Sequence, residues 1–292
     1  MSIAIGLDIG GTKIAGAAFD AQGNEVARTQ QPTPADYGAF LETCCAVVAE
    51  LEGKTGKAES IGACAPYAVA NLPFLVGKPL REDLGGLLGH EVGLANDANC
   101  AALAEAVDGA GQGHASVFGL ILGTGVGGGF VLNGKVVAGA HGLCGEIGHL
   151  PLPFYEEDDG ERVMCGCSQK GCIDKLASGP ALIRLYKKIS GQDAHGASMI
   201  AERAGQGDRA AAETLDRYYT VVAKAMVAII HSFDPDVIAV SGGVSKLPGL
   251  YEEVPKRWGR YALAKAPKTR FVQAKHGAMA GLRGAALIGK MH

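Results

Sequence analysis

The sequence predicts an α/β protein made of two similar domains. Apolar runs of strand length alternate with Ala- and Leu-rich helical segments, which is typical of this class. A strand, a glycine turn and a second strand occur near the N-terminus and again from residue 116. The length of 292 residues also exceeds what one hydrophobic core usually spans. We expect domains at 1–115 and 116–292, with the last helix, at about 278–292, packed on the first domain.

Each half is predicted to follow the same plan. In the first half we expect strands at 3–7, 14–19, 25–30, 60–64 and 92–95, and helices at 35–51 and 98–107. In the second half we expect strands at 116–122, 130–132, 135–138 and 237–240, and helices at 180–189, 208–233 and 278–289. The repeated arrangement indicates duplicated domains that face each other.

Composition excludes several classes of protein. Hydrophobic residues make up 48% and charged residues 20% of the chain, which is ordinary for a globular protein. The net charge of −3 offers no basic surface for nucleic acid or an anionic membrane. The N-terminus lacks the basic segment of a signal peptide, and the most apolar helix, at 221–230, is too short to cross a bilayer. We therefore expect a cytoplasmic enzyme with small-molecule ligands, and neither nucleic acid nor membrane as a partner.

A cluster of cysteines predicts a metal site. The polar, glycine-rich stretch Cys165-Gly-Cys167-Ser-Gln-Lys-Gly-Cys172 holds three thiols, and His149 lies sixteen residues upstream of the first. Three thiolates and an imidazole are the closed, tetrahedral donor set of structural Zn²⁺. Buried thiols without a metal are the alternative, which suits the other five cysteines better because they lie in apolar or mixed segments. A disulfide framework is the weaker option for a chain of this length.

Two glycine-rich turns predict phosphate binding. The first strand ends in Asp8-Ile-Gly-Gly-Thr-Lys13, and a later strand ends in Gly123-Thr-Gly-Val-Gly-Gly-Gly129. Backbone amides in tight glycine turns form concave anion sites, which larger side chains would block. Asp8 is placed to hold Mg²⁺, while Thr12 and Lys13 can reach phosphate oxygens. Flexible hairpin turns are the alternative, and the matching positions of the two turns favour phosphate.

A third candidate is the segment Asn96-Asp97-Ala-Asn99, between a strand and a helix. Aspartate at such a position often caps the helix. The end of a strand is also where α/β proteins bind ligands, and a carboxylate there could accept the proton of a substrate hydroxyl. From the residues alone, a helix cap and a catalytic base are about equally good interpretations of Asp97.

These motifs occur in order, together with Gly145-Glu-Ile-Gly-His149, and the set resembles the ROK family of bacterial sugar kinases. The run at 119–129, followed by Asn133-Gly-Lys135, is similar to the N-acetyl-D-glucosamine (GlcNAc) kinases of that family. The resemblance covers nearly the whole chain. It implies an actin-like ATPase fold of two RNase H-like α/β domains, with ATP bound in the interdomain cleft.

The resemblance also implies roles for individual residues. Asp97 would be the base that takes the proton of the sugar 6-hydroxyl, which gives GlcNAc 6-phosphate. The sugar would contact Asn96, Glu146, His149 and Asp174. ATP and Mg²⁺ would be bound by Gly6, Leu7, Asp8, Ile9, Gly10, Gly11, Thr12, Lys13, Thr124, Gly125, Val126, Gly127, Gly128, Gly129, Phe130, Val131, Leu132, Gly242 and Gly243. Zinc would be held by His149, Cys165, Cys167 and Cys172. A homodimer is expected on the same ground.

Two departures from the family pattern bear on the sugar. Family members usually carry Glu two residues after the last cysteine, where this chain has the shorter Asp174. The segment at 62–71 is shorter than the family loop that borders the sugar, and it lacks the glycine after Pro66. We therefore expect altered sugar specificity or weakened activity.

Three hypotheses follow. The first is a GlcNAc kinase, with glucose, N-acetylmannosamine or fructose as alternative substrates. The second is a sugar-responsive repressor on the same fold, which the lack of a DNA-binding extension and of basic charge disfavours. The third is a catalytically inactive sugar or nucleotide sensor, which the intact Asp8, Lys13 and Asp97 disfavour and the altered segment at 64–71 favours.

Overall fold

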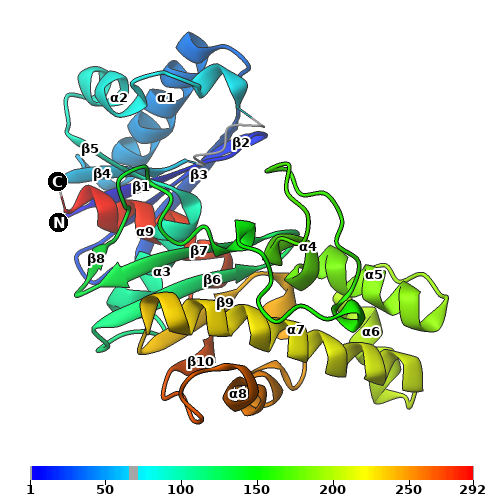
Figure 1. Ribbon diagram of the computed structural model, residues 1–292. Coiled ribbons are helices and arrows are strands. Elements are labelled where there is room, and N and C mark those ends of the chain that lie inside the picture. Colours follow the sequence, from blue (N-terminus) through cyan, green and yellow to red (C-terminus); the bar gives the residue numbers. More distant parts are fainter. Residues whose placement is uncertain (1, 66–71, 292) are drawn as a thin grey trace. The chain divides into compact units, whose positions relative to one another are not determined.

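The computed structural model describes residues 2–65 and 72–291 (Figure 1). The chain divides into two compact units, Met1–Ala104 with Ala278–His292, and Glu105–Gly277. This division falls inside helix α3 (Asp97–Asp108). The sequence-based boundary between 115 and 116 stays a prediction.

The first unit contains a five-stranded sheet with the order β3-β2-β1-β4-β5. The strands are β1 (Ala4–Ile9), β2 (Lys13–Phe19), β3 (Glu25–Pro32), β4 (Ser60–Cys64) and β5 (Val92–Ala95). β1, β2 and β3 form an antiparallel meander, and β4 and β5 continue the sheet in parallel from β1. The predicted meander and the two further strands expected at 60–64 and 92–95 are confirmed.

Helices cover both faces of this sheet. The helical elements are α1 (Tyr37–Thr55), η1 (Pro73–Leu75), α2 (Leu80–Leu88), α3, η5 (Gly277–Met279) and α9 (Ala280–Gly289). Ile5 and Leu7 share a hydrophobic cluster with the buried face of α1. Side chains alternate along a strand, and the neighbouring Ala4 clusters instead with Leu282 of α9. The last helix thus packs on the first unit, against β1, β4 and β5.

The second unit repeats this topology, with the order β10-β9-β6-β7-β8. The strands are β6 (Ser116–Leu122), β7 (Val126–Leu132), β8 (Lys135–Val136), β9 (Val237–Ser241) and β10 (Arg270–Gln273). β6, β7 and β8 form the antiparallel meander, and β9 and β10 follow in parallel from β6. The prediction of a duplicated α/β plan is therefore confirmed.

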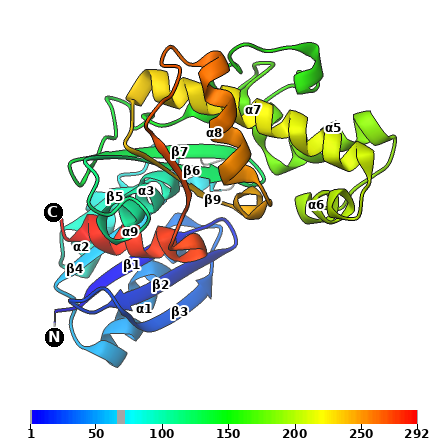
Figure 2. The same cartoon turned by 90° about the horizontal axis from the view of Figure 1, so that it is seen from below.

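The long helix α7 (Arg209–Phe233) organises the core of the second unit. The other helical elements are η2 (Ile147–His149), η3 (Glu157–Asp159), α4 (Ile173–Ala177), α5 (Gly179–Ser190), α6 (Ala197–Gly205), η4 (Gly243–Lys246) and α8 (Leu250–Tyr261). Asp208 caps α7 by accepting hydrogen bonds from two backbone amides. α5, α6 and α8 pack against α7, and α8 lies beside it in Figure 2. This packing buries Trp258 of α8.

A buried ion cluster fastens the segment before the cysteines to α7. The side chain of Lys224 is fully buried, and its Nζ lies 2.8 Å from Asp159 Oδ2 and 2.9 Å from Glu156 Oε2. Burial lowers the pKa of Lys224, but the hydrogen bonds to Asp159 and Glu156 outweigh this effect and raise it. The ammonium is therefore charged at neutral pH, and the buried charge is paired.

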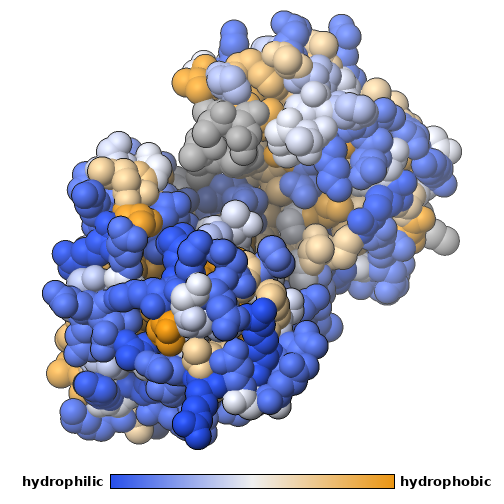
Figure 3. Space-filling view, turned by 90° about the vertical axis from the view of Figure 1, so that its right-hand side faces the viewer, coloured by the Kyte–Doolittle hydropathy of each residue, from blue (hydrophilic) through white to orange (hydrophobic). Residues whose placement is uncertain are grey.

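The surface is ordinary for a folded chain. Figure 3 shows a face on which hydrophilic side chains predominate and hydrophobic residues are scattered. Among the described helices, none combines the length and the apolar character that a bilayer crossing requires.

Candidate active site

The first glycine turn joins β1 to β2 and is held by several hydrogen bonds. The Gly10 amide donates to the Lys13 carbonyl at 3.0 Å, and the Thr33 hydroxyl donates to the Gly10 carbonyl at 2.7 Å. Thr12 and Lys13 are exposed at the turn. The turn is thus rigid in its backbone, and it presents a hydroxyl and an ammonium to solvent.

Asp8 lies inside β1, which continues to Ile9, rather than after the end of the strand. The half-buried carboxylate faces Cys64 in the parallel pairing of β1 and β4, and the Cys64 thiol donates to Asp8 Oδ1 at 3.2 Å. Hydrogen bonding to Cys100 and burial raise the pKa of Cys64 well above its ordinary value. Cys64 therefore stays a neutral thiol that orients the Asp8 carboxylate.

Gly6 serves the packing of the first unit. A Cβ on Gly6 would lie 2.0 Å from the carbonyl oxygen of Leu282 in α9. Glycine at this position allows the helix backbone to contact the strand directly. Gly6, Leu7 and Ile9 are all buried, so a nucleotide contact at these three positions stays a prediction.

The helix after β5 is capped by Asn96, and this leaves Asp97 exposed. The Asn96 Oδ1 accepts a hydrogen bond from the Asn99 amide at 2.7 Å. Asp97 is the first residue of α3, and its Oδ1 accepts from the Ala98 amide at 2.9 Å. Asn96 is 2% exposed, whereas Asp97 is exposed. The cap thus falls to Asn96, and the carboxylate of Asp97 can face a substrate at the end of β5.

The second glycine turn is shorter than the sequence predicts. Only 123–125 lie between β6 and β7, so Gly127, Gly128 and Gly129 belong to β7. A Cβ on Gly128 would lie 2.4 Å from the Phe118 ring, so this glycine is needed for packing. Phe130 and Val131 are buried, while Leu132 is 44% exposed. The predicted phosphate loop is therefore corrected to a short turn followed by a strand, and nucleotide contacts along β7 stay predictions.

A large cavity opens beside this turn. Its volume is about 880 Å³, and its wall includes Gly123, Thr124, Gly179, Gly243 and the charged residues Glu202 and Lys246. The remaining lining residues are mostly apolar: Pro180, Ile183, Val244, Leu247 and Pro248 among them. An apolar cavity of this size with a few polar groups suits a small organic ligand such as a nucleoside.

Gly242 directly precedes Gly243, one of the residues that line this cavity. Its φ of 88° is in the left-handed region, and a Cβ there would lie 2.3 Å from the Leu122 carbonyl oxygen. Glycine at this position lets the chain turn closely over β6 into η4. Gly243, the next residue, lines the cavity itself. The predicted glycine pair thus contributes one residue to the turn and one to the wall.

Glu146 and His149 lie on one short turn that packs on β7. A Cβ on Gly148 would lie 2.0 Å from the Val126 carbonyl oxygen, so this turn contacts the strand directly. The His149 Nδ1 lies 3.6 Å from the Cys165 Sγ, and its Nε2 lies 4.0 Å from Glu146 Oε2. One edge of the imidazole therefore faces the cysteines and the other faces Glu146.

The four predicted metal ligands come together. Their donor atoms all lie within 4.8 Å of one another. The Cys167 and Cys172 sulfurs are 3.5 Å apart, and the Cys165 sulfur is 3.6 Å from His149 Nδ1. Ligands at about 2.3 Å from a tetrahedral zinc would be separated by about 3.8 Å. The spacing and the chemistry of this donor set fit a structural zinc ion.

Asp174 contacts the second glycine turn. Its Oδ1 accepts a hydrogen bond from the Val126 amide at 2.8 Å, and its Oδ2 lies 2.9 Å from the Lys175 Nζ. The hydrogen bond and the charge of Asp174 raise the pKa of Lys175. A sugar contact of Asp174 stays a prediction, and its contacts in the structure are with the turn and with Lys175.

Sequence analysis missed two of these features. Cys64 is buried, as expected for a core thiol, but its hydrogen bond to Asp8 depends on the parallel pairing of β1 and β4 and was not predicted. The bond between Val126 and Asp174 joins residues 48 positions apart, and no local pattern predicts it. Part of the atypical segment at 62–71, namely 66–71, lies outside the described residues.

The fold and these sites define an α/β protein with two glycine turns, an exposed carboxylate at a strand end and a Cys₃His cluster. A model of the ROK family matches residues 4–291, and the chain belongs to this family. It is 39% identical over 297 residues to an N-acetyl-D-glucosamine kinase of Vibrio vulnificus, with 97% of this chain and 98% of the relative covered. It is 40% identical over 302 residues to an N-acetyl-D-glucosamine kinase of Salmonella paratyphi A, with the same coverage.

Solved structures of sugar kinases share the fold. A ROK hexokinase from Thermus thermophilus has a TM-score of 0.85 and 33% identity, and the match covers 99% of this chain and 98% of that one. A ROK family glucokinase from Streptomyces griseus, solved with glucose and AMPPNP, has a TM-score of 0.76 and 31% identity over 100% of both chains. The actin-like ATPase architecture expected from the sequence is thus confirmed.

Proposed function

We propose that this chain is an ATP-dependent sugar kinase that phosphorylates the 6-hydroxyl of GlcNAc. The observation that carries the proposal is the exposed carboxylate of Asp97 at the end of β5. It is available to a substrate because Asn96, and not Asp97, caps helix α3. The curated relatives named as GlcNAc kinases, at 38–40% identity, support this choice of substrate. The relative solved with glucose makes glucose the second candidate.

In the proposed reaction, O6 of the sugar attacks the γ-phosphorus of ATP. The new O6–P bond forms as the bond between the γ-phosphorus and the ADP oxygen breaks, and Asp97 accepts the hydroxyl proton. The first unit would supply Asp97, Lys13 and the amides of its turn. The second unit would supply Glu146 and the Nε2 edge of His149 to sugar hydroxyls. Its 880 Å³ cavity would take the adenosine, with Gly243 in the wall.

Two metal ions fit this proposal. Mg²⁺, when bound, would neutralise phosphate charge, and the oriented Asp8 carboxylate is the residue of the first turn that suits it. Zinc in the Cys₃His cluster would fix η2, which directly follows Glu146, against the start of α4. The metal would bind the Nδ1 edge of His149, so the same ring could serve the zinc and the sugar. We also propose a cytoplasmic homodimer, as the family resemblance implies.

The test is GlcNAc-dependent release of ADP from Mg-ATP. Asp97→Asn keeps the size of the side chain and removes the base, so kcat should fall by roughly 10²–10⁴-fold. Glu91→Gln is the matched control, because it removes an exposed carboxylate at the opposite end of β5 and should leave kcat within about twofold. Equal activity of Asp97→Asn and the wild type would refute the assignment of the base.

A further inference from the structure

The glycine turn at 123–125 is fastened by a side chain from a distant part of the second unit. Val126, the residue that follows the turn, gives its amide to Asp174 Oδ1 at 2.8 Å. The carboxylate is 14% exposed, and its other oxygen pairs with the Lys175 ammonium at 2.9 Å. Both oxygens are thus engaged within the protein. The bond lies at the point where the turn becomes β7.

Gly125 shows how closely the carboxylate approaches the turn. A Cβ on Gly125 would lie 2.7 Å from Asp174 Oδ1, well inside van der Waals contact. The φ of Gly125 is not in the left-handed region. An alanine there would therefore clash with the carboxylate without adding backbone strain. The turn and the carboxylate are therefore fitted to each other.

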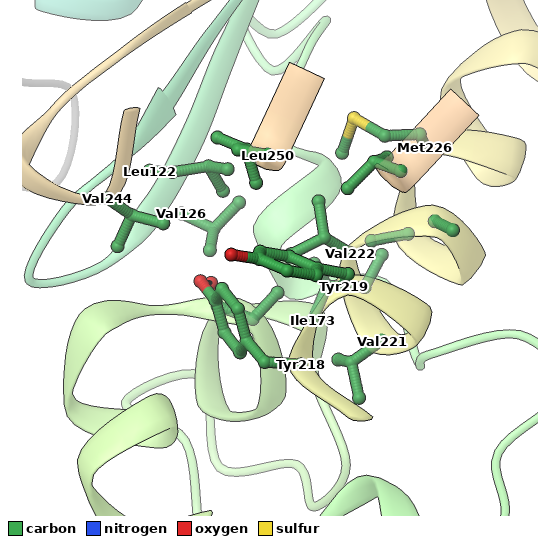
Figure 4. Packing of buried hydrophobic residues seen from close by; sticks show 14 of the residues in the cluster. Leu122, Val126, Ile173, Tyr218, Tyr219, Val221, Val222, Met226, Val244 and Leu250 are labelled. Atoms are coloured by element: carbon green, nitrogen blue, oxygen red, sulfur yellow. Dashed lines mark hydrogen bonds between the residues drawn. The ribbon is translucent and has the colours of Figure 1, made fainter. Parts of the chain in front are cut away.

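The same carboxylate is anchored at its own end. Asp174 follows the predicted zinc ligand Cys172 by two residues and lies in the first turn of α4. Its neighbour Ile173 and the neighbour of the turn, Val126, both belong to the hydrophobic cluster seen in Figure 4. The Ile173 amide also donates to the Leu150 carbonyl at 2.9 Å, next to His149. The cysteine cluster, the sugar-side turn η2 and the glycine turn thus meet at this short helix.

We infer that Asp174 is a positioning residue for the nucleotide, which holds the glycine turn at 123–125 in place for the phosphates. This inference rests on the proposed kinase function, and it differs from the sugar contact that the family resemblance implies for this position. The carboxylate fixes the Val126 amide and the turn before it, so the remaining amides keep the orientation that an anion requires. Lys175 offsets the negative charge of Asp174 beside the phosphates.

Steady-state kinetics with ATP and GlcNAc varied separately distinguish the two roles. Asp174→Ala should lower kcat/KM for ATP by roughly 10- to 150-fold, which is the loss of one hydrogen bond to a charged group. The KM for GlcNAc at saturating ATP should change by less than about twofold. Asp174→Asn keeps an acceptor for Val126 and should recover most of the loss. Asp193→Ala, which removes an exposed carboxylate of the same unit, is the control and should behave as the wild type.

A double-mutant cycle with Gly125→Ala tests the contact itself. Alone, Gly125→Ala should lower kcat/KM for ATP at least tenfold, because its methyl group meets Asp174. In the Asp174→Ala background the same methyl group finds space, so its further effect should be less than about threefold. Additive effects of the two substitutions would overturn the inference.

The outcomes separate this inference from the proposed function. A wild-type chain without sugar-dependent ADP release would refute the proposed function, whatever the variants do. A wild type that phosphorylates GlcNAc while Asp174→Ala raises only the KM for GlcNAc would refute the positioning role and restore the sugar contact. Zinc content and the circular dichroism spectrum of each variant, equal to those of the wild type, show that a change in kinetics is not a loss of fold.

Discussion

Removal of the buried ammonium of Lys224 should destabilise the second unit strongly. In Lys224→Met, the Asp159 carboxylate would keep only one hydrogen-bond donor among the described residues, the Glu156 amide at 2.7 Å. The Asp159 side chain is 5% exposed, so the carboxylate would stay largely shielded from bulk solvent after the loss of its partner. Such an uncompensated buried charge costs about 3–5 kcal/mol. Lys187→Met is the control, because it breaks the ion pair of Lys187 with Asp193, whose side chains are 60% and 72% exposed. It should cost less than about 1 kcal/mol.

The assay is equilibrium unfolding in urea followed by tryptophan fluorescence. The chain has a single tryptophan, and Trp258 of α8 is buried in the same hydrophobic cluster as residues of α7, the helix that carries Lys224. The signal therefore reports the packing of this unit. Lys224→Met combined with Asp159→Asn removes the orphaned charge and should recover at least half of the lost free energy of unfolding. A cost for Lys224→Met as small as that for Lys187→Met would refute the reasoning.

Three further changes test other parts of the structure. Gly284→Ala puts a Cβ 1.8 Å from a backbone carbonyl oxygen, so thermal denaturation should show a first unit that is severely destabilised or unfolded. Gly53→Ala is the control: its Cβ would meet nothing within 4 Å, and it should be neutral or stabilising by up to about 1 kcal/mol. Cys165→Ser should lose the zinc that plasma emission spectrometry detects and lower the melting temperature, while Cys45→Ser should keep one zinc per chain; equal metal content in the two would contradict the site. Cys64→Ala removes the thiol donor to its neighbouring carboxylate and should raise the Mg²⁺ concentration for half-maximal activity, with no change in zinc content.

Sequence patterns predicted the sheets well because each strand carries its own signal. The bounds expected for β4, β5 and β6 coincide with those observed, since these short apolar runs are bounded by polar or glycine-containing segments. The expected start of α7 at 208 differs by one residue from the observed start, because Asp208 is the N-cap that precedes the helix. The repeated strand and turn pattern was enough to predict the duplicated topology.

The elements that were missed depend on tertiary packing. α8 contains Pro255 and a charged, weakly helical sequence, but Leu250, Val254 and Trp258 recur every four residues and bury one face. α2 contains Gly85 and Gly86, which disfavour a helix when taken alone. α6 and β10 are short and carry few buried residues, so neither had a pattern long enough to detect.

The glycine run after β6 is a segment for which the sequence predicts a loop and the structure has a strand. Its composition predicts a flexible loop, yet the three consecutive glycines at 127–129 pair with β6 as part of β7. Gly128 is required there because a Phe118 ring occupies the space of its side chain. The low strand propensity of these glycines is outweighed by pairing with β6 and by packing against the turn that contains Gly148. The candidate site residues were predicted by motif, and their contacts could only be learned from the fold.

The most direct test of the central claim is a comparison of kcat/KM for several sugars, with the product identified by NMR. ADP release from Mg-ATP would be measured with GlcNAc, glucose, N-acetylmannosamine and fructose. The account predicts the highest kcat/KM with GlcNAc and a phosphorus signal coupled to the C6 protons of the product. A higher kcat/KM for another hexose would contradict the assigned substrate, and no turnover with any of the four sugars would contradict the kinase itself.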